Sequence, residues 1–175
     1  MRASFAVTCL LFAFTVTGWA QDTRNAEAWT TDWSAFIKKL SAEATKHDYF
    51  VSDVNEAFSG KKVTWTGSVT KIDQPKSESD SGLVRLSMKS AKLELKSGPQ
   101  TLDALTLRPK ADEWKTWKQI TAGDTVSFTT TLDEGELWRS VLVKMDGTGS
   151  HAGETVVFVN TKGGTCLKVV GQNGK

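Results

Sequence analysis

The chain is poor in the residues that most often hold metals, because its 175 residues include only two cysteines and two histidines. Structural zinc sites and iron–sulfur clusters are built mainly from sets of cysteine and histidine ligands, so this composition excludes a typical site of either kind. We predict no metal and no cofactor. A strong charge of one sign is also lacking, since 22 basic and 20 acidic residues leave a formal net charge of +2. This balance excludes a strongly basic nucleic-acid coat and an acidic tail protein.

The overall composition is that of a globular protein, with 39% hydrophobic and 24% charged residues. The length fits one domain, or one domain with appendages. Residues 1–20 have the features of a secretory signal peptide: Arg2 is the positive start, residues 6–16 are a short apolar run, and Gly18 and Ala20 precede the expected cleavage site. The alternative is a buried N-terminal helix. We expect an exported protein, secreted or periplasmic, without a membrane span, because a spanning helix needs about 20 apolar residues.

Cleavage after residue 20 would remove Cys9 and leave Cys166 as the one remaining cysteine. An internal disulfide is then impossible, so stability must come from a packed core. Cys166 lies in an apolar pattern with Leu167, Val169 and Val170. This pattern favours a buried, inert thiol over an intermolecular bridge or a reactive site.

Residues 21–60 are predicted to form an N-terminal helical segment. Apolar residues recur there at helical spacing, at Trp29, Trp33, Phe36, Ile37, Leu40 and Ala44. We expect this amphipathic helix to dock on the following domain; the alternative is a helix that binds a partner protein. A shorter helix is predicted over residues 51–58, with Gly60 just after its end.

Residues 61–145 show the period-two alternation of β-strands. Strands are predicted at 63–69, 83–96, 102–107, 126–132 and 137–145, with a short helix at 112–120. Gly67 suggests a bulge or strong coiling. The apolar face changes near Lys89 and Ser90, which predicts a bulge or a kink there. Residues 146–175 are predicted to form a loop and a terminal hairpin of strands 155–159 and 165–170, joined by a turn at 160–164. The sequence leaves open whether this hairpin closes the barrel or extends one edge.

Three strands, a short helix and two more strands are the order of an OB-fold, a five-stranded Greek-key barrel. We therefore predict a mainly β protein: an OB-fold barrel with an N-terminal amphipathic helix and a C-terminal β-hairpin. Residues 60–69 and 117–128 resemble the opening strand and the helix-to-strand turn of OB proteins. With Asn55-Glu56 before the first strand, the chain resembles the exported bacterial tRNA-anticodon-binding-like OB group over about residues 52–145. The shared motifs are structural, so the resemblance implies a fold more than a function.

No catalytic set is evident. A hydrolytic triad needs a base beside a nucleophile, and we interpret both His47 and His151 as surface residues. The adjacent acids at 112–113 and 133–134 are expected to point apart, which disfavours glycosidase chemistry. The Gly-rich run 146–150 lacks the spaced acids of a calcium loop and the Lys-Ser/Thr end of a P-loop. We predict a protein that is not an enzyme.

The candidate ligand-binding residues are Arg85, Lys89, Lys92 and Trp138. The three cations lie opposite the apolar face of the second strand, where OB-folds bind their ligands. Trp138 lies opposite the apolar face of the predicted fifth strand, so it is a candidate stacking platform; packing against the N-terminal helix is the equal alternative. Trp65 is expected in the core.

Nucleic acid is disfavoured by the loops beside this groove, since phosphate would be repelled by their acids. These acids are Asp73, Glu78 and Asp80 in the first loop, and Asp133, Glu134 and Glu136 in the second. Aromatic residues for base stacking are also scarce there. We therefore predict a non-catalytic binding module for an oligosaccharide, peptide or protein partner, with single-stranded nucleic acid as the alternative.

Overall fold

A computed structural model describes residues 28–48, 51–77, 82–96, 98–133, 138–143 and 154–171. The expected signal peptide, His151 and the loop 146–153 lie outside these residues. Among the described residues, no helix combines the length and the apolar character that crossing a membrane requires.

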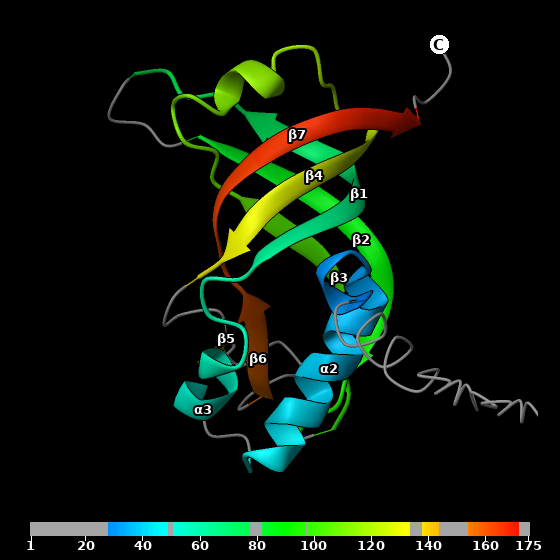
Figure 1. Cartoon of the computed structure of the whole chain (residues 1–175), viewed down its shortest axis with the longest axis vertical. Coiled ribbons are helices and arrows are strands. Elements are labelled where there is room, and N and C mark those ends of the chain that lie inside the picture. Colours follow the sequence, from blue (N-terminus) through cyan, green and yellow to red (C-terminus); the bar gives the residue numbers. More distant parts are fainter. Residues whose placement is uncertain are drawn as a thin grey trace, which may run out of the picture.

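The chain contains four helical segments and seven strands within the described ranges (Figure 1). The helical segments are η1 (Ala28–Thr30), α2 (Trp33–Lys46), α3 (Val51–Glu56) and η2 (Trp114–Thr116). The strands are β1 (Lys62–Asp73), β2 (Leu83–Leu93), β3 (Gln100–Leu107), β4 (Thr125–Leu132), β5 (Trp138–Val143), β6 (Glu154–Val159) and β7 (Thr161–Gly171).

Five strands form one antiparallel sheet in the order β3-β2-β1-β4-β7. A single β-bridge between Arg108 and Gly163 joins the end of β3 to β7, so the two outer strands meet and the sheet closes on itself. The short helix η2 lies between β3 and β4 along the chain, and Figure 1 shows it at one end of the curved sheet. This strand order and helix position confirm the predicted OB-fold barrel.

The pairing of the C-terminal strands differs from the prediction. The fifth strand of the barrel is β7, whereas the predicted fifth strand, here β5, pairs with β6 in a separate two-stranded sheet. The predicted terminal hairpin and its turn at 160–164 are therefore wrong. The physical reason is close packing: a Cβ added to Gly164 would lie 3.0 Å from a methyl carbon of Leu107, and the Trp117 indole N–H donates to the Gly164 carbonyl at 2.8 Å. The glycines let β7 pass close to β3 and η2, and they do not make a turn.

Because β7 is the fifth barrel strand, β5 and β6 both belong to the connection between the fourth and fifth strands. In an OB-fold this connection is one of the two loops that flank the ligand groove. β7 also buries Cys166. Burial raises the pKa of the Cys166 thiol, which favours its protonated form. The predicted burial is confirmed, and the inertness of the thiol stays a prediction.

The helix α2 docks on the barrel as predicted. Its aromatic face packs on Trp65 of β1, with ring centroids 5.0 Å from Trp33 and 4.9 Å from Phe36. The Trp65 indole N–H donates to the carbonyl of Trp29 at 3.2 Å. Asp32 caps the helix by accepting from the Ala35 amide at 2.6 Å. Helix and barrel therefore share one hydrophobic core.

Local details of the strands agree with the prediction in part. The pairing of β2 with β3 shifts between Ser87 and Ala91, which confirms the predicted irregularity near Lys89. In β1 the shift lies between Val69 and Lys71 and not at Gly67. A Cβ on Gly67 would lie 2.8 Å from the Met88 sulfur, so this glycine permits close approach of β2. The predicted helix 112–120 is a single 3₁₀ turn flanked by turns.

Candidate ligand-binding cavity

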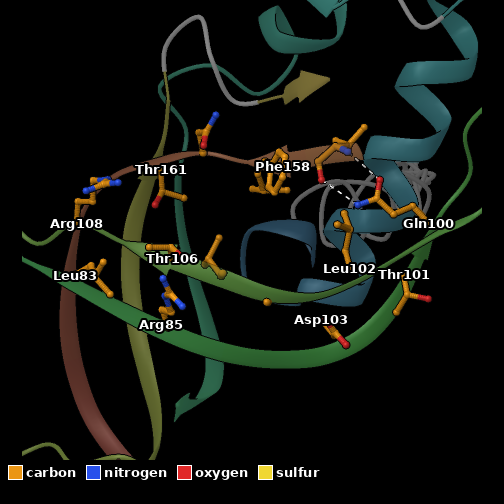
Figure 2. A pocket seen from close by; sticks show the side chains of 15 residues that line it. Leu83, Arg85, Gln100, Thr101, Leu102, Asp103, Thr106, Arg108, Phe158 and Thr161 are labelled. Atoms are coloured by element: carbon orange, nitrogen blue, oxygen red, sulfur yellow. Dashed lines mark hydrogen bonds between the residues drawn. The ribbon is translucent and has the colours of Figure 1, made fainter. Parts of the chain in front are cut away.

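A cavity of about 510 Å³ lies between β3 and β6 (Figure 2). We call it the interstrand cavity; it is lined by residues 100–106 and 157–161 together with Leu83, Arg85 and Arg108. The β3 lining includes outward residues such as Thr106 and buried residues such as Leu105. Successive side chains point to opposite faces of a strand. Because the cavity contacts residues of both faces, it lies along the edge of β3.

Gln100 holds β6 next to β3. Its side-chain amide donates to the Val157 carbonyl at 3.0 Å and accepts from the Val157 N–H at 2.9 Å (Figure 2). The backbone N–H and C=O of Val157, on the edge of β6, thus have the hydrogen-bond partners that a neighbouring strand would provide. The Val157 side chain is buried. One end of the interstrand cavity is therefore closed by Gln100.

Two guanidinium groups and one carboxylate line the interstrand cavity. Arg85 lies on β2, directly across from Thr106 of β3. Arg108 follows β3 at the opposite end of the cavity from Gln100, beside Thr161 (Figure 2). Asp103 is the one acidic residue of the lining. The charged side chains of the lining thus carry a net positive charge.

Two acids that the sequence analysis expected to repel phosphate have basic partners. Asp73 lies 2.7 Å from the ammonium group of Lys71, and Asp133 lies 3.1 Å from that of Lys162. Such exposed pairs add little stability, but each one offsets a carboxylate charge locally. The other four loop acids lie outside the described residues.

Phe158 supplies an aromatic surface to the interstrand cavity. Its side chain is 49% exposed and lines the cavity from β6. Every other aromatic side chain that the structure describes is buried: Trp29, Trp33, Phe36, Phe58, Trp65, Trp114, Trp117 and Phe128. The sequence analysis did not single out Phe158. The available signal was its position in the strand 155–159, where alternation places it opposite Val157 and Val159.

The structure brings one of the four predicted site residues into the cavity. Arg85 lines it, whereas Lys89 and Lys92 are exposed on β2 and are not part of the lining. Lys89 falls inside the irregular stretch of β2, beyond which the strand continues in a shifted register. Trp138 is paired with Val159 at the start of β5, next to the cavity, and its side chain lies outside the described residues. The binding roles of these four residues stay predictions.

The histidine that the structure describes is placed among acids at the end of α2. The His47 ring nitrogens lie 3.5 Å from a Glu43 oxygen and 3.7 Å from an Asp53 oxygen. Within the described ranges, no group of three or more His, Cys, Asp or Glu residues could hold a metal ion. That the protein is not an enzyme stays a prediction.

No protein-family model and no curated protein matches the sequence. Among solved structures, the chain is similar to a putative nucleic acid-binding lipoprotein from Klebsiella pneumoniae, with 11% identity and a TM-score of 0.43 over 82% of this chain and 97% of that one. It is also similar to the mitochondrial single-stranded DNA-binding protein Rim1 of S. cerevisiae, with 11% identity and a TM-score of 0.33 over 64% of this chain and 99% of that one. The fold assignment rests on the strand order described above. Membership of the tRNA-anticodon-binding-like group stays a resemblance.

Proposed function

We propose that this protein binds single-stranded nucleic acid in the interstrand cavity. The observation that carries the proposal is that one exposed aromatic ring, Phe158, and two guanidinium groups, Arg85 and Arg108, line the same cavity. Aromatic rings stack on unpaired bases, and guanidinium groups bind phosphate oxygens through paired hydrogen bonds. The position also agrees, because OB-folds bind oligonucleotides over strands two and three and beside the loop between strands four and five.

The sequence analysis favoured an oligosaccharide, peptide or protein partner for two reasons. It found no stacking residue in the groove other than Trp138, and it expected the loop acids to repel phosphate. Phe158 removes the first reason. The ion pairs of Asp73 and Asp133 weaken the second. Nucleic acid therefore becomes the main proposal.

An extended peptide is the second candidate, and one observation favours it. The edges of β3 and β6 face each other across the interstrand cavity, and the Gln100 amide already occupies a peptide-like position against Val157. A peptide can add to an exposed strand edge through main-chain hydrogen bonds. Affinity of this kind depends little on salt, since no phosphate charge is involved.

The test is fluorescence anisotropy with a labelled twelve-nucleotide oligothymidylate at low salt. Replacing both Arg85 and Arg108 with alanine is expected to weaken binding and to flatten the logarithmic salt dependence by about 0.7 for each phosphate that the variant no longer binds. Phe158→Ala is expected to weaken binding by about 1–3 kcal/mol and to leave the salt dependence unchanged, because stacking carries no net charge.

Two exposed residues outside the cavity lining provide matched controls: Lys118→Ala removes one cation, and Leu167→Ala removes one exposed apolar side chain. Both variants should bind as the unchanged protein does. A flat anisotropy signal with the oligonucleotide at low salt contradicts the proposal. Salt-insensitive binding of an extended peptide, with no binding of the oligonucleotide, supports the second candidate.

Export is a further part of the proposal, motivated by residues 1–20. Expression of the full chain in a bacterial host is expected to release a processed protein into the periplasm or the medium. N-terminal sequencing of that fraction should begin at Gln21. A protein that keeps Met1 and stays in the cytoplasm contradicts export.

A further inference from the structure

The interstrand cavity is bounded at both ends by connections between strands. Gln100 spans from β3 to β6 at one end through its two bonds to Val157. At the other end the β-bridge between Arg108 and Gly163 joins β3 to β7. The back wall is formed by side chains that are almost completely buried, among them Leu105 and Val157. A ligand group therefore enters from the solvent side.

This closure limits how a polymer can lie in the cavity. A strand that ran lengthwise through it would have to break both bonds of Gln100 or separate β3 from β7. A side group that projects from a strand running outside needs neither change. The volume of about 510 Å³ is within the range of pockets that hold a single small molecule.

The small number of exposed aromatic side chains also favours the binding of a single base. Proteins that bind long single strands offer a series of aromatic rings on which successive bases stack. Of the aromatic side chains that the structure describes, only Phe158 is exposed, and it lies inside the cavity lining. The described surface thus offers a stacking position for one base.

The two arginines lie together toward the end of the interstrand cavity that is away from Gln100, on the same side of Phe158 (Figure 2). Arg85 comes from β2 across from Thr106, and Arg108 lies two residues beyond Thr106 at the end of the cavity. Both side chains are exposed. Guanidinium groups at these positions would bind the phosphates at the solvent side of the interstrand cavity while the base lies inside it.

We propose, resting on the function proposed above, that the interstrand cavity captures one unstacked base, whose neighbouring phosphates are bound by Arg85 and Arg108. The shared chemistry is a pyrimidine or purine ring flanked by phosphates, and its source is either a strand or a free nucleotide. The protein then binds short single-stranded sites or strand ends and does not coat long strands.

The test is a length series of oligothymidylates of two, three, six and twelve nucleotides, titrated into the full chain at one low salt concentration. A longer strand can place any of several of its bases in the cavity, so the measured affinity is divided by the number of these alternative positions, or registers. The affinity per register is expected to stop rising at three nucleotides. A trinucleotide with an abasic middle position should bind roughly 5- to 100-fold more weakly, and this difference should vanish in Phe158→Ala. Leu167→Ala serves as the control and should keep the difference.

The outcomes separate the two proposals. An affinity per register that still rises more than tenfold between three and twelve nucleotides overturns single-base capture and leaves nucleic-acid binding intact. Equal binding of the abasic and intact trinucleotides also overturns it. If thymidine 3′,5′-bisphosphate binds as tightly as the trinucleotide, base capture is supported and a free nucleotide is the source. Absence of binding to every oligonucleotide overturns the proposed function itself.

Discussion

Trp65→Ala is expected to lower the free energy of unfolding by about 3–5 kcal/mol. The indole is 1% exposed and lies between the barrel and α2, with ring centroids 5.0 Å from Trp33 and 4.9 Å from Phe36. Its removal leaves a cavity where helix and sheet meet and also leaves the Trp29 carbonyl without its donor. Domains of this size are stable by about 5–15 kcal/mol, so the loss should be plain in urea or thermal unfolding of the full chain.

Two further variants separate the causes of this effect. Trp65→Phe keeps an aromatic ring in the core and loses the hydrogen bond to Trp29, so a smaller cost of about 1–3 kcal/mol is expected. Thr66→Ala changes the exposed neighbour on the opposite face of β1 and should stay within about 0.5 kcal/mol. A cost below about 1 kcal/mol for Trp65→Ala would mean that α2 does not pack on β1 in solution.

Gly82→Ala is expected to lower the free energy of unfolding by about 2–5 kcal/mol, from two additive sources. The residue has a φ of +55°, a left-handed conformation that costs a residue with a side chain about 1–2 kcal/mol. A Cβ there would also lie 2.5 Å from a ring carbon of Trp114 and 2.7 Å from the Asp73 carbonyl oxygen. Such overpacking typically costs about 1–3 kcal/mol because the neighbours must shift.

Gly98→Ala measures backbone strain without a side-chain clash and is compared with Gly82→Ala. Gly98 also has a positive φ, +115°, but an added Cβ would meet no atom within 4 Å. This variant should lose stability in thermal unfolding through backbone strain alone, and that strain is larger than at Gly82, because a φ of +115° lies outside the left-handed region that a residue with a side chain can adopt. If Gly82→Ala costs as much as Gly98→Ala or more, the contacts of residue 82 add to its smaller strain; a cost of only about 1 kcal/mol would show that the contact with Trp114 is unimportant. The comparison also concerns the interstrand cavity, since Gly82 directly precedes Leu83 of its lining.

The parts of the fold that were predictable are those with a short-range signal. Helical spacing from Trp29 to Ala44 predicted the docking helix, and period-two alternation predicted the strands β1 to β4. Arg85 was identified because alternation places it on the outer face of β2, whichever strand becomes its neighbour. Each of these inferences depends only on residues that are close together in the sequence, within the same helix or the same strand.

The interstrand cavity and its aromatic ring depend on residues that are far apart in the chain. Gln100 meets Val157, Trp117 meets Gly164, and Arg108 pairs with Gly163. An alternating strand has the same local pattern whichever partner it pairs with, so β5, β6 and β7 could not be assigned to their sheets from their own residues. Partner choice follows from packing, since the small Gly164 fits against Leu107 and lets β7 close the barrel. That closure places β6 beside β3 and so creates the cavity that Phe158 lines.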